Sequence, residues 1–188
     1  MRIVLASASP RRRELLETLG VKYEILPALG PEQPPEGADA EQTVRALSRS
    51  KALEVARKRP DAVVVGADTV VVCDGKILGK PRDEENARQM LRMLSGRDHS
   101  VFTGVTLVCG EKVLTEAEQT KVFFRAITDE EITRYIATGE PMDKAGAYAC
   151  QGLASLFVER IEGDYFNVVG LPLYRLGQML EKMGVTLL

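Results

Sequence analysis

Apolar positions along the chain repeat with two different periods, and these periods predict both strands and helices. Short continuous or alternating apolar runs predict strands, whereas apolar residues three and four positions apart predict helices. Leu15, Leu16 and Leu19, for example, share one side of a helix that Pro10 begins and Gly20 ends. We expect strands over residues 3–6, 22–26, 62–73, 76–78, 99–109, 112–126 and 153–161. We expect helices over residues 11–19, 40–59, 83–94, 128–137 and 171–183.

Turn and cap signals between these segments indicate how the elements connect. Asp74-Gly75 is typical of a two-residue hairpin turn, and Thr128 with Glu131 fits a capping box at a helix start. Strands alternate with helices early in the chain and hairpins dominate its middle, so we expect an α/β fold with a mixed sheet. The 188 residues suit a single domain over residues 1–188, built as two lobes that share one core. A cleft between such lobes is a natural place for a ligand.

Composition and charge argue against several classes of partner. The net charge is only −2 and no basic stripe is present, so nucleic acid is not an expected partner. No apolar run reaches membrane-spanning length, and the short apolar amino terminus precedes its arginines, the wrong order for a secretory signal. The odd number of cysteines, Cys73, Cys109 and Cys150, indicates a reducing, cytoplasmic location. With His99 as the single histidine, any metal is expected to be a hard cation on carboxylates and phosphates rather than zinc.

The first candidate site is the sequence Ser-Ala-Ser-Pro-Arg-Arg-Arg at residues 7–13. It lies between a buried strand and a helix start, where Ser9 is the expected N-cap. Unpaired N–H groups and the helix dipole favour an anion there, and arginine forks match phosphate oxygens in pairs. Arginines in a first helical turn oppose the dipole unless an anion neutralises them. The alternative is a capped surface helix with solvated arginines, and the residues alone leave both interpretations open.

The second candidate is Asp68, a carboxylate inside an apolar segment. It interrupts the apolar runs at residues 62–65 and 70–72. A buried, ionised carboxylate is costly unless it is paired or coordinated. Asp68 could therefore ligate Mg²⁺ or act as a base on water. Alternatively, it caps local backbone groups or points outward from an edge strand.

Weaker signals come from later in the chain. A proline-fixed turn presents Lys80, which could meet a phosphate as a point charge, although an ordinary solvated lysine is the simpler explanation. The glycine-containing loop at residues 139–151 ends in Gln151, whose amide both donates and accepts and so could recognise a base edge. A plain surface loop is the alternative. In the turn expected ahead of the last helix, we expect Tyr165 and Phe166 to lie in the core rather than to stack on a base.

Taken together, these segments resemble the Maf family. The matching motifs are Leu-Ala-Ser-Ala-Ser-Pro-Arg-Arg at 5–12, Gly-Ala-Asp-Thr-Val-Val at 66–71, Gly-Lys-Pro at 79–81, Leu-Ser-Gly at 94–96, Asp-Lys-Ala-Gly-Ala-Tyr at 143–148, Gln-Gly at 151–152 and Val-Gly-Leu-Pro at 169–172. Each motif alone is weak, but their joint order and spacing over nearly the whole chain are specific.

The resemblance implies a fold and an activity. The implied fold is similar to that of the inosine triphosphatases, a twisted mixed sheet flanked by helices with a central cleft between two lobes. The implied activity is that of a nucleoside triphosphate pyrophosphatase, which hydrolyses the bond between the α- and β-phosphates. A divalent cation (Mg²⁺, Mn²⁺ or Co²⁺) and a homodimer are also implied.

Residue roles follow from the same resemblance. Asp68 is the implied proton acceptor for the attacking water, and Glu32 and Asp68 are the implied metal ligands. The implied phosphate contacts are Ser7, Arg11, Arg12, Lys51, Lys80 and Lys144. The family often carries two adjacent acidic residues where this chain has Pro31-Glu32, so its metal shell departs from the family pattern at that point.

Substrate choice is implied to rest on Arg11, Thr69 and Gln151. The late loop, Ala-Gly-Ala-Tyr followed by Gln-Gly, is similar to the branch that acts on dTTP and UTP. An amide suits uracil or thymine, which present both an N–H donor and a carbonyl acceptor. We therefore expect a pyrimidine triphosphate, standard or modified, as the substrate. Two alternatives stay open: specificity for 7-methyl-GTP or another purine nucleotide, and a non-catalytic nucleotide-binding regulator of cell division.

Overall fold

The computed structural model describes residues 1–188, which divide into two compact units. The first unit consists of Met1–Asp68, Thr103–Glu118 and Gly170–Leu188, and the second of Thr69–Phe102 and Gln119–Val169. The sequence predicts a single domain whose two lobes share one core. The shared core stays a prediction. None of the helices combines the length and the apolar character needed to cross a lipid bilayer.

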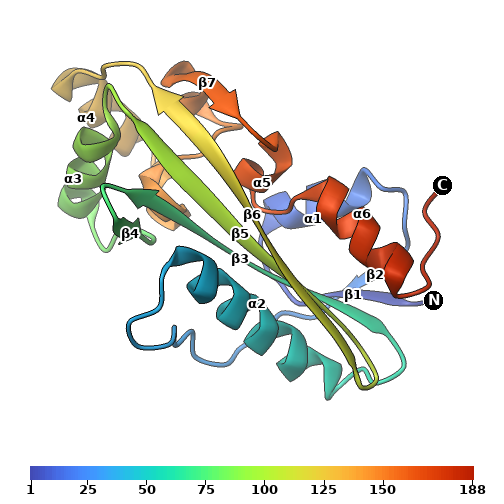
Figure 1. Cartoon of the computed structure of the whole chain (residues 1–188). Helices are drawn as coiled ribbons and strands as arrows, with labels where there is room; N and C mark the ends of the chain where they lie inside the picture. The colour runs from blue at the N-terminus through green and yellow to red at the C-terminus, as the bar shows by residue number, and fades with distance from the viewer. The chain divides into compact units, whose positions relative to one another are not determined.

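The strands form one mixed sheet of seven strands, in the order β2-β1-β3-β5-β6-β7 with β4 paired to β3 (Figure 1). β1 is parallel to both β2 and β3, whereas the β3–β4 and β6–β7 pairs are antiparallel. The strand bounds are β1 (Ile3–Leu5), β2 (Tyr23–Ile25), β3 (Val63–Cys73), β4 (Lys76–Leu78), β5 (Asp98–Cys109), β6 (Lys112–Phe124) and β7 (Val158–Glu162). The predicted α/β class with a mixed sheet is therefore confirmed.

Helices flank the sheet, and capping residues mark several of their starts. In the first unit they are α1 (Pro10–Glu17), α2 (Ala40–Ala56) and α6 (Leu173–Lys182). In the second unit they are α3 (Glu84–Leu94), α4 (Asp129–Ala137), α5 (Tyr165–Val169) and the short 3₁₀ helices η1 (Glu140–Asp143), η2 (Ala145–Ala147) and η3 (Leu153–Leu156). The Thr128–Glu131 capping box is present at α4, and Asp39 forms a second one at α2. Pro10 opens α1 as predicted, but Ser9 at its N-cap makes no side-chain capping bond.

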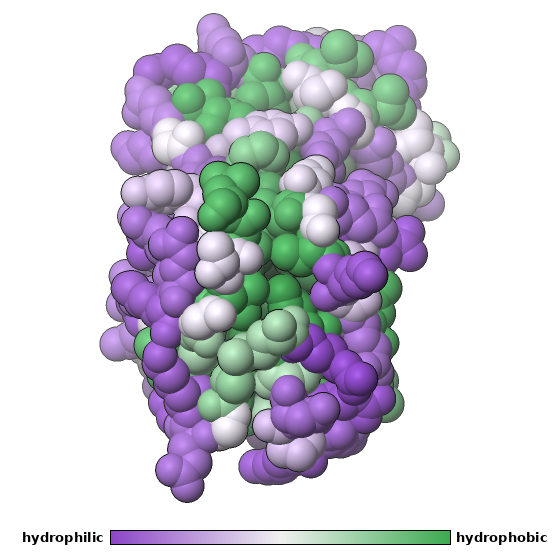
Figure 2. Space-filling model, turned by 90° about the vertical axis from the view of Figure 1, so that its right-hand side faces the viewer, coloured by the Kyte–Doolittle hydropathy of each residue, from purple (hydrophilic) through white to green (hydrophobic).

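Each unit has its own apolar core. In the first unit, residues of β1 and β3 pack with α2, and the buried members are Val4, Ala6, Ala52, Val55, Ala62, Val64 and Val108. In the second unit, β5 and β6 pack with α3 and α4 through residues such as Leu91, Val101, Phe124 and Ile132. Figure 2 shows that apolar residues also gather along the middle of one molecular face, with hydrophilic residues at its margins. Such residual apolar exposure is normal for a folded protein.

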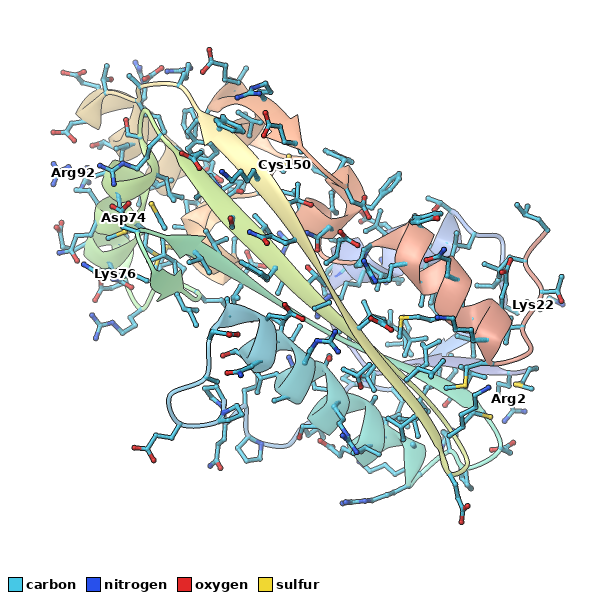
Figure 3. The ribbon with its side chains drawn as sticks, viewed as in Figure 1. Arg2, Lys22, Asp74, Lys76, Arg92 and Cys150 are labelled. Carbon is cyan, nitrogen blue, oxygen red and sulfur yellow. The ribbon has the colours of Figure 1, made fainter.

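The hairpin turn between β3 and β4 forms where Asp74-Gly75 predicted it. Both residues have positive φ, 49° at Asp74 and 72° at Gly75, which is the requirement of the turn type that suits strand twist. The Asp74 carboxylate is paired with Arg97. Asp74 and Lys76 lie at this hairpin, next to each other in Figure 3.

Three expectations for the late part of the chain are wrong. The strand predicted over residues 153–161 is a 3₁₀ helix, η3, followed by the shorter strand β7. The turn predicted ahead of the last helix contains α5, because the Asp164 side chain accepts a hydrogen bond from Phe166 N at 2.8 Å and supports a helical turn. Tyr165 and Phe166 are 41% and 40% exposed rather than in the core. Apolar and polar residues are mixed in both η3 and β7, so this pattern alone did not distinguish the short helix from the strand.

Two glycines allow α2 to pack closely against strands of the first unit. A Cβ at Gly66 of β3 would collide with the carbonyl oxygen of Ser48, and a Cβ at Gly104 of β5 would collide with that of Val44. The close approach also lets the Ser48 hydroxyl bond Thr106 Oγ1 at 3.0 Å. The glycine at the start of the Gly-Ala-Asp-Thr motif is thus a packing requirement, and it brings α2 next to Asp68.

We expect Gly66→Ala and Gly104→Ala each to lower the free energy of unfolding by about 1–3 kcal/mol, because an added methyl overpacks a closed interface. Gly177→Ala in α6 is the matched control. A Cβ there would meet only Leu187 Cδ1 at 3.7 Å, and alanine favours a helix over glycine. Urea unfolding of the three variants tests this. Equal midpoints for all three would contradict the packing argument.

Candidate active site

Lys51 joins two carboxylates in the first unit. Its Nζ lies 2.6 Å from Asp68 Oδ1 and 2.7 Å from Glu32 Oε1. Asp68 is 7% exposed, on the stretch of β3 that α2 covers. A buried carboxylate stays ionised when a charged partner compensates for its lost hydration. Because β3 lies inside the sheet, the alternative in which Asp68 points outward from an edge strand is wrong.

Arg12 is held rigidly beside this ion pair. Its Nε donates to the carbonyl of Gly170 at 2.8 Å, and its Nη1 donates to the carbonyl of Ala67 at 2.9 Å and to Ser7 Oγ at 3.4 Å. Burial lowers the pKa of Arg12, and the nearby carboxylates of Asp68 and Glu32 oppose that shift. The guanidinium therefore sits in one electrostatic cluster with these two acids.

The start of α1 adds further positive charge to the cluster. The positive charge of Arg11 also acts on Arg12, in the direction that lowers the Arg12 pKa. The Ser7 hydroxyl accepts from Ser9 N at 3.2 Å, so it shapes the turn between β1 and the helix. The first turn of α1 contains no acidic residue that would neutralise the arginines or the N-terminal N–H groups. Such an end of a helix favours a bound anion. We call Ser7, Arg11, Arg12, Glu32, Lys51 and Asp68 the Asp68 cluster.

The remaining predicted residues lie in the second unit. Gly146 N donates to the carbonyl of Gly79 at 3.0 Å, so the turn that carries Lys80 is tied to the loop that carries Lys144. Gly146 has φ +69°, and a Cβ there would lie 2.9 Å from Val71 Cγ2. The Lys144 ammonium is paired with Asp143. A glycine is required at this junction both for its backbone conformation and for space.

The loop between Lys144 and Gln151 is held in place by a buried contact of Tyr148 with His99. The Tyr148 hydroxyl lies 2.7 Å from His99 Nε2, and the two rings pack edge to face against each other. Burial lowers the pKa of His99 to about 4, so this histidine is neutral at physiological pH. The single histidine of the chain therefore supports the loop and adds no charge to it. Gln151 itself is exposed.

The structure brings the predicted residues together in two groups. The first is the Asp68 cluster, and the second contains Lys80 and Lys144, with Gln151 later in the same loop. Thr69 follows Asp68 directly on β3. The convergence of both groups on one triphosphate stays a prediction. The sequence did not indicate the groups that hold Arg12, which are the main-chain carbonyls of Ala67 and Gly170. Any residue type can supply a main-chain carbonyl, so such contacts leave no pattern in the sequence.

The donor set of the Asp68 cluster is suitable for a divalent cation. No group of three or more His, Cys, Asp or Glu side chains is placed to hold a metal ion. Glu32 and Asp68 nevertheless direct oxygens at one cation, the Lys51 ammonium. Mg²⁺ is commonly held by one or two carboxylates, with waters and substrate phosphates as its other ligands. The two carboxylates fit that pattern.

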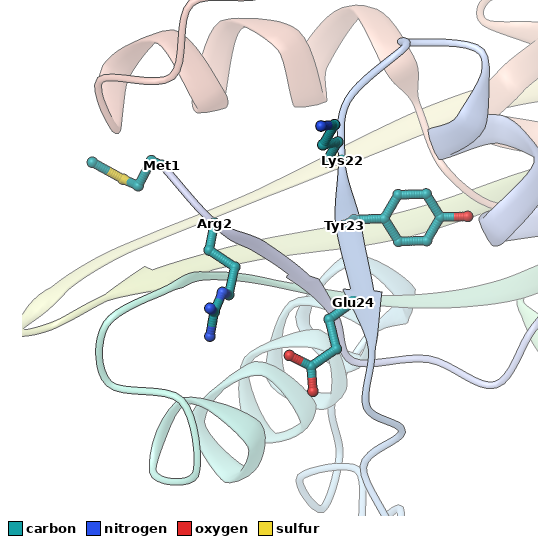
Figure 4. Close-up of a pocket in the computed structure, with 5 residues that line it drawn as sticks. All are labelled: Met1, Arg2, Lys22, Tyr23 and Glu24. Carbon is teal, nitrogen blue, oxygen red and sulfur yellow. The ribbon is translucent and has the colours of Figure 1, made fainter.

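A separate surface pocket in the first unit contains none of the predicted residues. It is lined by Met1, Arg2, Lys22, Tyr23 and Glu24, as Figure 4 shows. The Glu24 carboxylate is already paired with Arg59 at 2.6 Å. The pocket therefore offers no group of side chains for the chemistry predicted from the sequence.

Known proteins resemble the chain over its full length. The family model described as "Maf-like protein" matches residues 2–183. A dTTP/UTP pyrophosphatase of Pelotomaculum thermopropionicum is 52% identical over 188 residues, 99% of this chain and 98% of that protein. A dTTP/UTP pyrophosphatase of a Geobacillus species is 54% identical over 182 residues, 97% of this chain and 98% of that protein. The structure of the Staphylococcus aureus Ham1 protein is similar in fold, with a TM-score of 0.53, 13% identity and coverage of 97% of this chain and 100% of that one.

Proposed function

Because the chain belongs to the Maf-like protein family, we propose that it is a nucleoside triphosphate pyrophosphatase that hydrolyses dTTP and UTP to the monophosphate and pyrophosphate. Relatives about half identical over nearly their full length carry the name dTTP/UTP pyrophosphatase. The observation that carries the proposal is the Asp68 cluster, in which a buried, lysine-paired carboxylate lies beside a fixed arginine. A base for water and cations for a triphosphate are thereby assembled in one place.

The arrangement supports a direct role for Asp68 in activating water. Its ion pair with Lys51 fixes the orientation of the carboxylate, as a general base requires. The base takes a proton from water while the water oxygen attacks the α-phosphorus and the bond to the β-phosphate oxygen breaks. Pyrophosphate leaves with the bond electrons. The proton remains on Asp68 until it is released to solvent.

The cationic residues stabilise the charge that develops on the leaving pyrophosphate. Arg12 is already oriented by two main-chain carbonyls, so it does not need to reorganise when a substrate arrives. Ser7, Arg11 and Lys51 are proposed as further phosphate contacts, because they belong to the same cluster as Arg12. Lys80 and Lys144 in the second unit are proposed as further phosphate contacts.

A divalent cation, Mg²⁺, Mn²⁺ or Co²⁺, is the proposed cofactor, with Glu32 and Asp68 as its protein ligands. When bound, such an ion neutralises phosphate charge and orients the triphosphate. This chain has Pro31-Glu32 where the family often has two adjacent acidic residues, so Glu32 is the proposed ligand from that loop. The contact of Glu32 with Lys51 supports this proposal.

We expect chelation with EDTA to stop turnover, and excess Mg²⁺ to restore it. Glu32→Gln should raise the Mg²⁺ concentration for half-maximal activity by about tenfold, because loss of a charged oxygen ligand weakens the binding of a hard cation. Glu36→Gln, a change in the same exposed loop, should leave the Mg²⁺ requirement unchanged. Equal Mg²⁺ requirements for the wild type and Glu32→Gln would remove Glu32 from the metal site.

Substrate choice is assigned to Arg11, Thr69 and Gln151. The Gln151 amide can pair with the N3–H donor and the adjacent carbonyl of uracil or thymine. A panel of dTTP, UTP, CTP, ATP, GTP and 7-methyl-GTP, with identified products, tests the proposal. We expect dTTP and UTP to be cleaved most efficiently, each giving pyrophosphate. Preferred cleavage of 7-methyl-GTP, or nucleotide binding without turnover in Mg²⁺ and Mn²⁺, would overturn it.

We further propose a cytoplasmic location and a homodimer. All three cysteines are free, which supports a reducing environment. Light scattering on the eluting protein distinguishes a dimer from a monomer.

A further inference from the structure

Gln151 lies in a turn whose two flanks are held by the same pair of side chains. Gly152 N donates to the carbonyl of Ala149 at 3.0 Å, which closes the turn around Gln151. Before the turn, Ala149 N donates to the hydroxyl of Tyr135 at 3.2 Å. After it, Leu153 N donates to Glu140 Oε2 at 3.1 Å. The exposed turn is thus tied on both sides to residues of α4 and η1.

Glu140 and Tyr135 are also bonded to each other. The Tyr135 hydroxyl donates to Glu140 Oε1 at 2.8 Å. A second main-chain group, Ala154 N, points at the same carboxylate oxygen at 3.5 Å. The carboxylate fills the space beside Gly152, where a Cβ would collide with it. Main-chain groups from both sides of Gln151 therefore converge on one hydrogen-bonded pair, and the glycine of the Gln-Gly motif makes room for it.

The pair rests on a rigid support. Tyr135 is 4% exposed and packs edge to face on Phe157, with ring centroids 5.3 Å apart. Because its ring is enclosed, its hydroxyl has a fixed position from which to orient the turn. A surface loop that needed only to be closed would not require a partly buried carboxylate bonded to a buried phenol, since exposed main-chain groups bond water readily.

The Gln151 side chain has an aromatic neighbour, Tyr165. Burial raises the pKa of Tyr165, and a hydrogen bond with the Gln151 side chain opposes that shift. Tyr165 stands on α5, which Asn167 anchors by donating to Thr120 Oγ1 at 2.9 Å. The Gln151 amide thus has a hydrogen-bond partner outside its own turn.

We propose that Tyr135 and Glu140 are positioning residues for Gln151, and that they set how strongly the enzyme selects a base with an N3–H donor without touching the nucleotide. The proposal rests on the proposed function, in which Gln151 reads the base. Placement matters because hydrogen-bond selection depends on distance and angle, and a displacement of about 1 Å can cost about 100-fold in rate.

The test compares UTP with its analogue methylated at N3, which lacks the N–H donor that an amide would read. For each protein the preference is the ratio of kcat/KM for UTP to that for the analogue. We expect Gln151→Ala to lower this ratio by about 100-fold, and Tyr135→Phe and Glu140→Ala to lower it by about tenfold. Tyr174→Phe and Glu130→Gln, which alter an exposed tyrosine and an exposed glutamate, are the controls and should leave it unchanged.

Two further measurements separate positioning from a general loss of structure. In the Gln151→Ala background, adding Tyr135→Phe should change kcat/KM for UTP by less than about twofold, because a residue that acts through Gln151 has nothing left to position. Inhibition by inorganic tripolyphosphate, which has no base, should be the same for Tyr135→Phe and the wild type.

The outcomes distinguish this inference from the proposed function. A wild type that does not hydrolyse UTP overturns the proposed function and this inference with it. A wild type that prefers UTP, with a preference lost in Gln151→Ala but intact in Tyr135→Phe and Glu140→Ala, overturns this inference alone. Equal losses for UTP and the analogue in Tyr135→Phe would also overturn it, since that pattern indicates a structural role.

Discussion

Asp68→Asn should lower kcat/KM for dTTP by about 1,000-fold while the protein stays folded, because asparagine cannot accept a proton and general-base catalysis typically contributes about 100- to 10,000-fold. Asparagine keeps the shape of the side chain and a carbonyl oxygen that can accept from Lys51 at the Oδ1 position, 2.6 Å away. Circular dichroism and the melting temperature establish folding, and pyrophosphate release gives the rate.

Asp61→Asn is the matched control for this change. Asp61 is an exposed aspartate of the same unit, with a long contact of 3.8 Å to Arg2. Surface pairs of this kind contribute little, so activity and stability should stay at wild-type levels. Near-normal pyrophosphate release by Asp68→Asn would remove Asp68 from the reaction, whatever its position in the fold.

Arg12→Lys should reduce both activity and stability, because Arg12 has a structural and a functional role. Lysine cannot reproduce the planar set of donors that reaches Gly170 O at 2.8 Å and Ala67 O at 2.9 Å. Each buried carbonyl left without its donor costs about 1–3 kcal/mol, so loss of both donors should lower the free energy of unfolding by about 2–6 kcal/mol. We expect kcat/KM for dTTP to fall by about 100-fold, as one preorganised phosphate donor is lost.

The next residue supplies the control for Arg12. Arg13 is about half exposed and makes a 3.7 Å helical pair with Glu17. Arg13→Lys keeps the charge and should change the free energy of unfolding by less than about 0.5 kcal/mol. Urea unfolding and steady-state kinetics on both variants decide the question. Equally small changes in stability and activity for Arg12→Lys and Arg13→Lys would show that the two carbonyl contacts contribute to neither.

The sequence predicted the elements around the Asp68 cluster because local rules govern them. Apolar periodicity located β1, α1 and β3, and Pro10 marked the first residue of α1. The apolar flanks of Asp68 correctly indicated a buried carboxylate in need of a partner. Its partner Lys51 had no local signal, since an isolated lysine on a helix is usually solvated. Only the family resemblance pointed to it.

Other features depended on contacts between distant segments. The role of Gly66 is visible only once α2 lies on β3, because the collision involves the carbonyl of Ser48. Tyr165 and Phe166 were expected in the core on composition, but the turn at Asp164 and the anchoring of Asn167 leave both rings exposed. Apolarity predicts burial on average, and it does not say which aromatic residues a short rigid turn will expose.

The most direct test of the central claim is hydrolysis of dTTP in water enriched in heavy oxygen, followed by mass spectrometry of the products. If water activated at Asp68 attacks the α-phosphorus, the label appears in dTMP and the released pyrophosphate is unlabelled. Label in the pyrophosphate, or products consisting of dTDP and orthophosphate, would contradict the account.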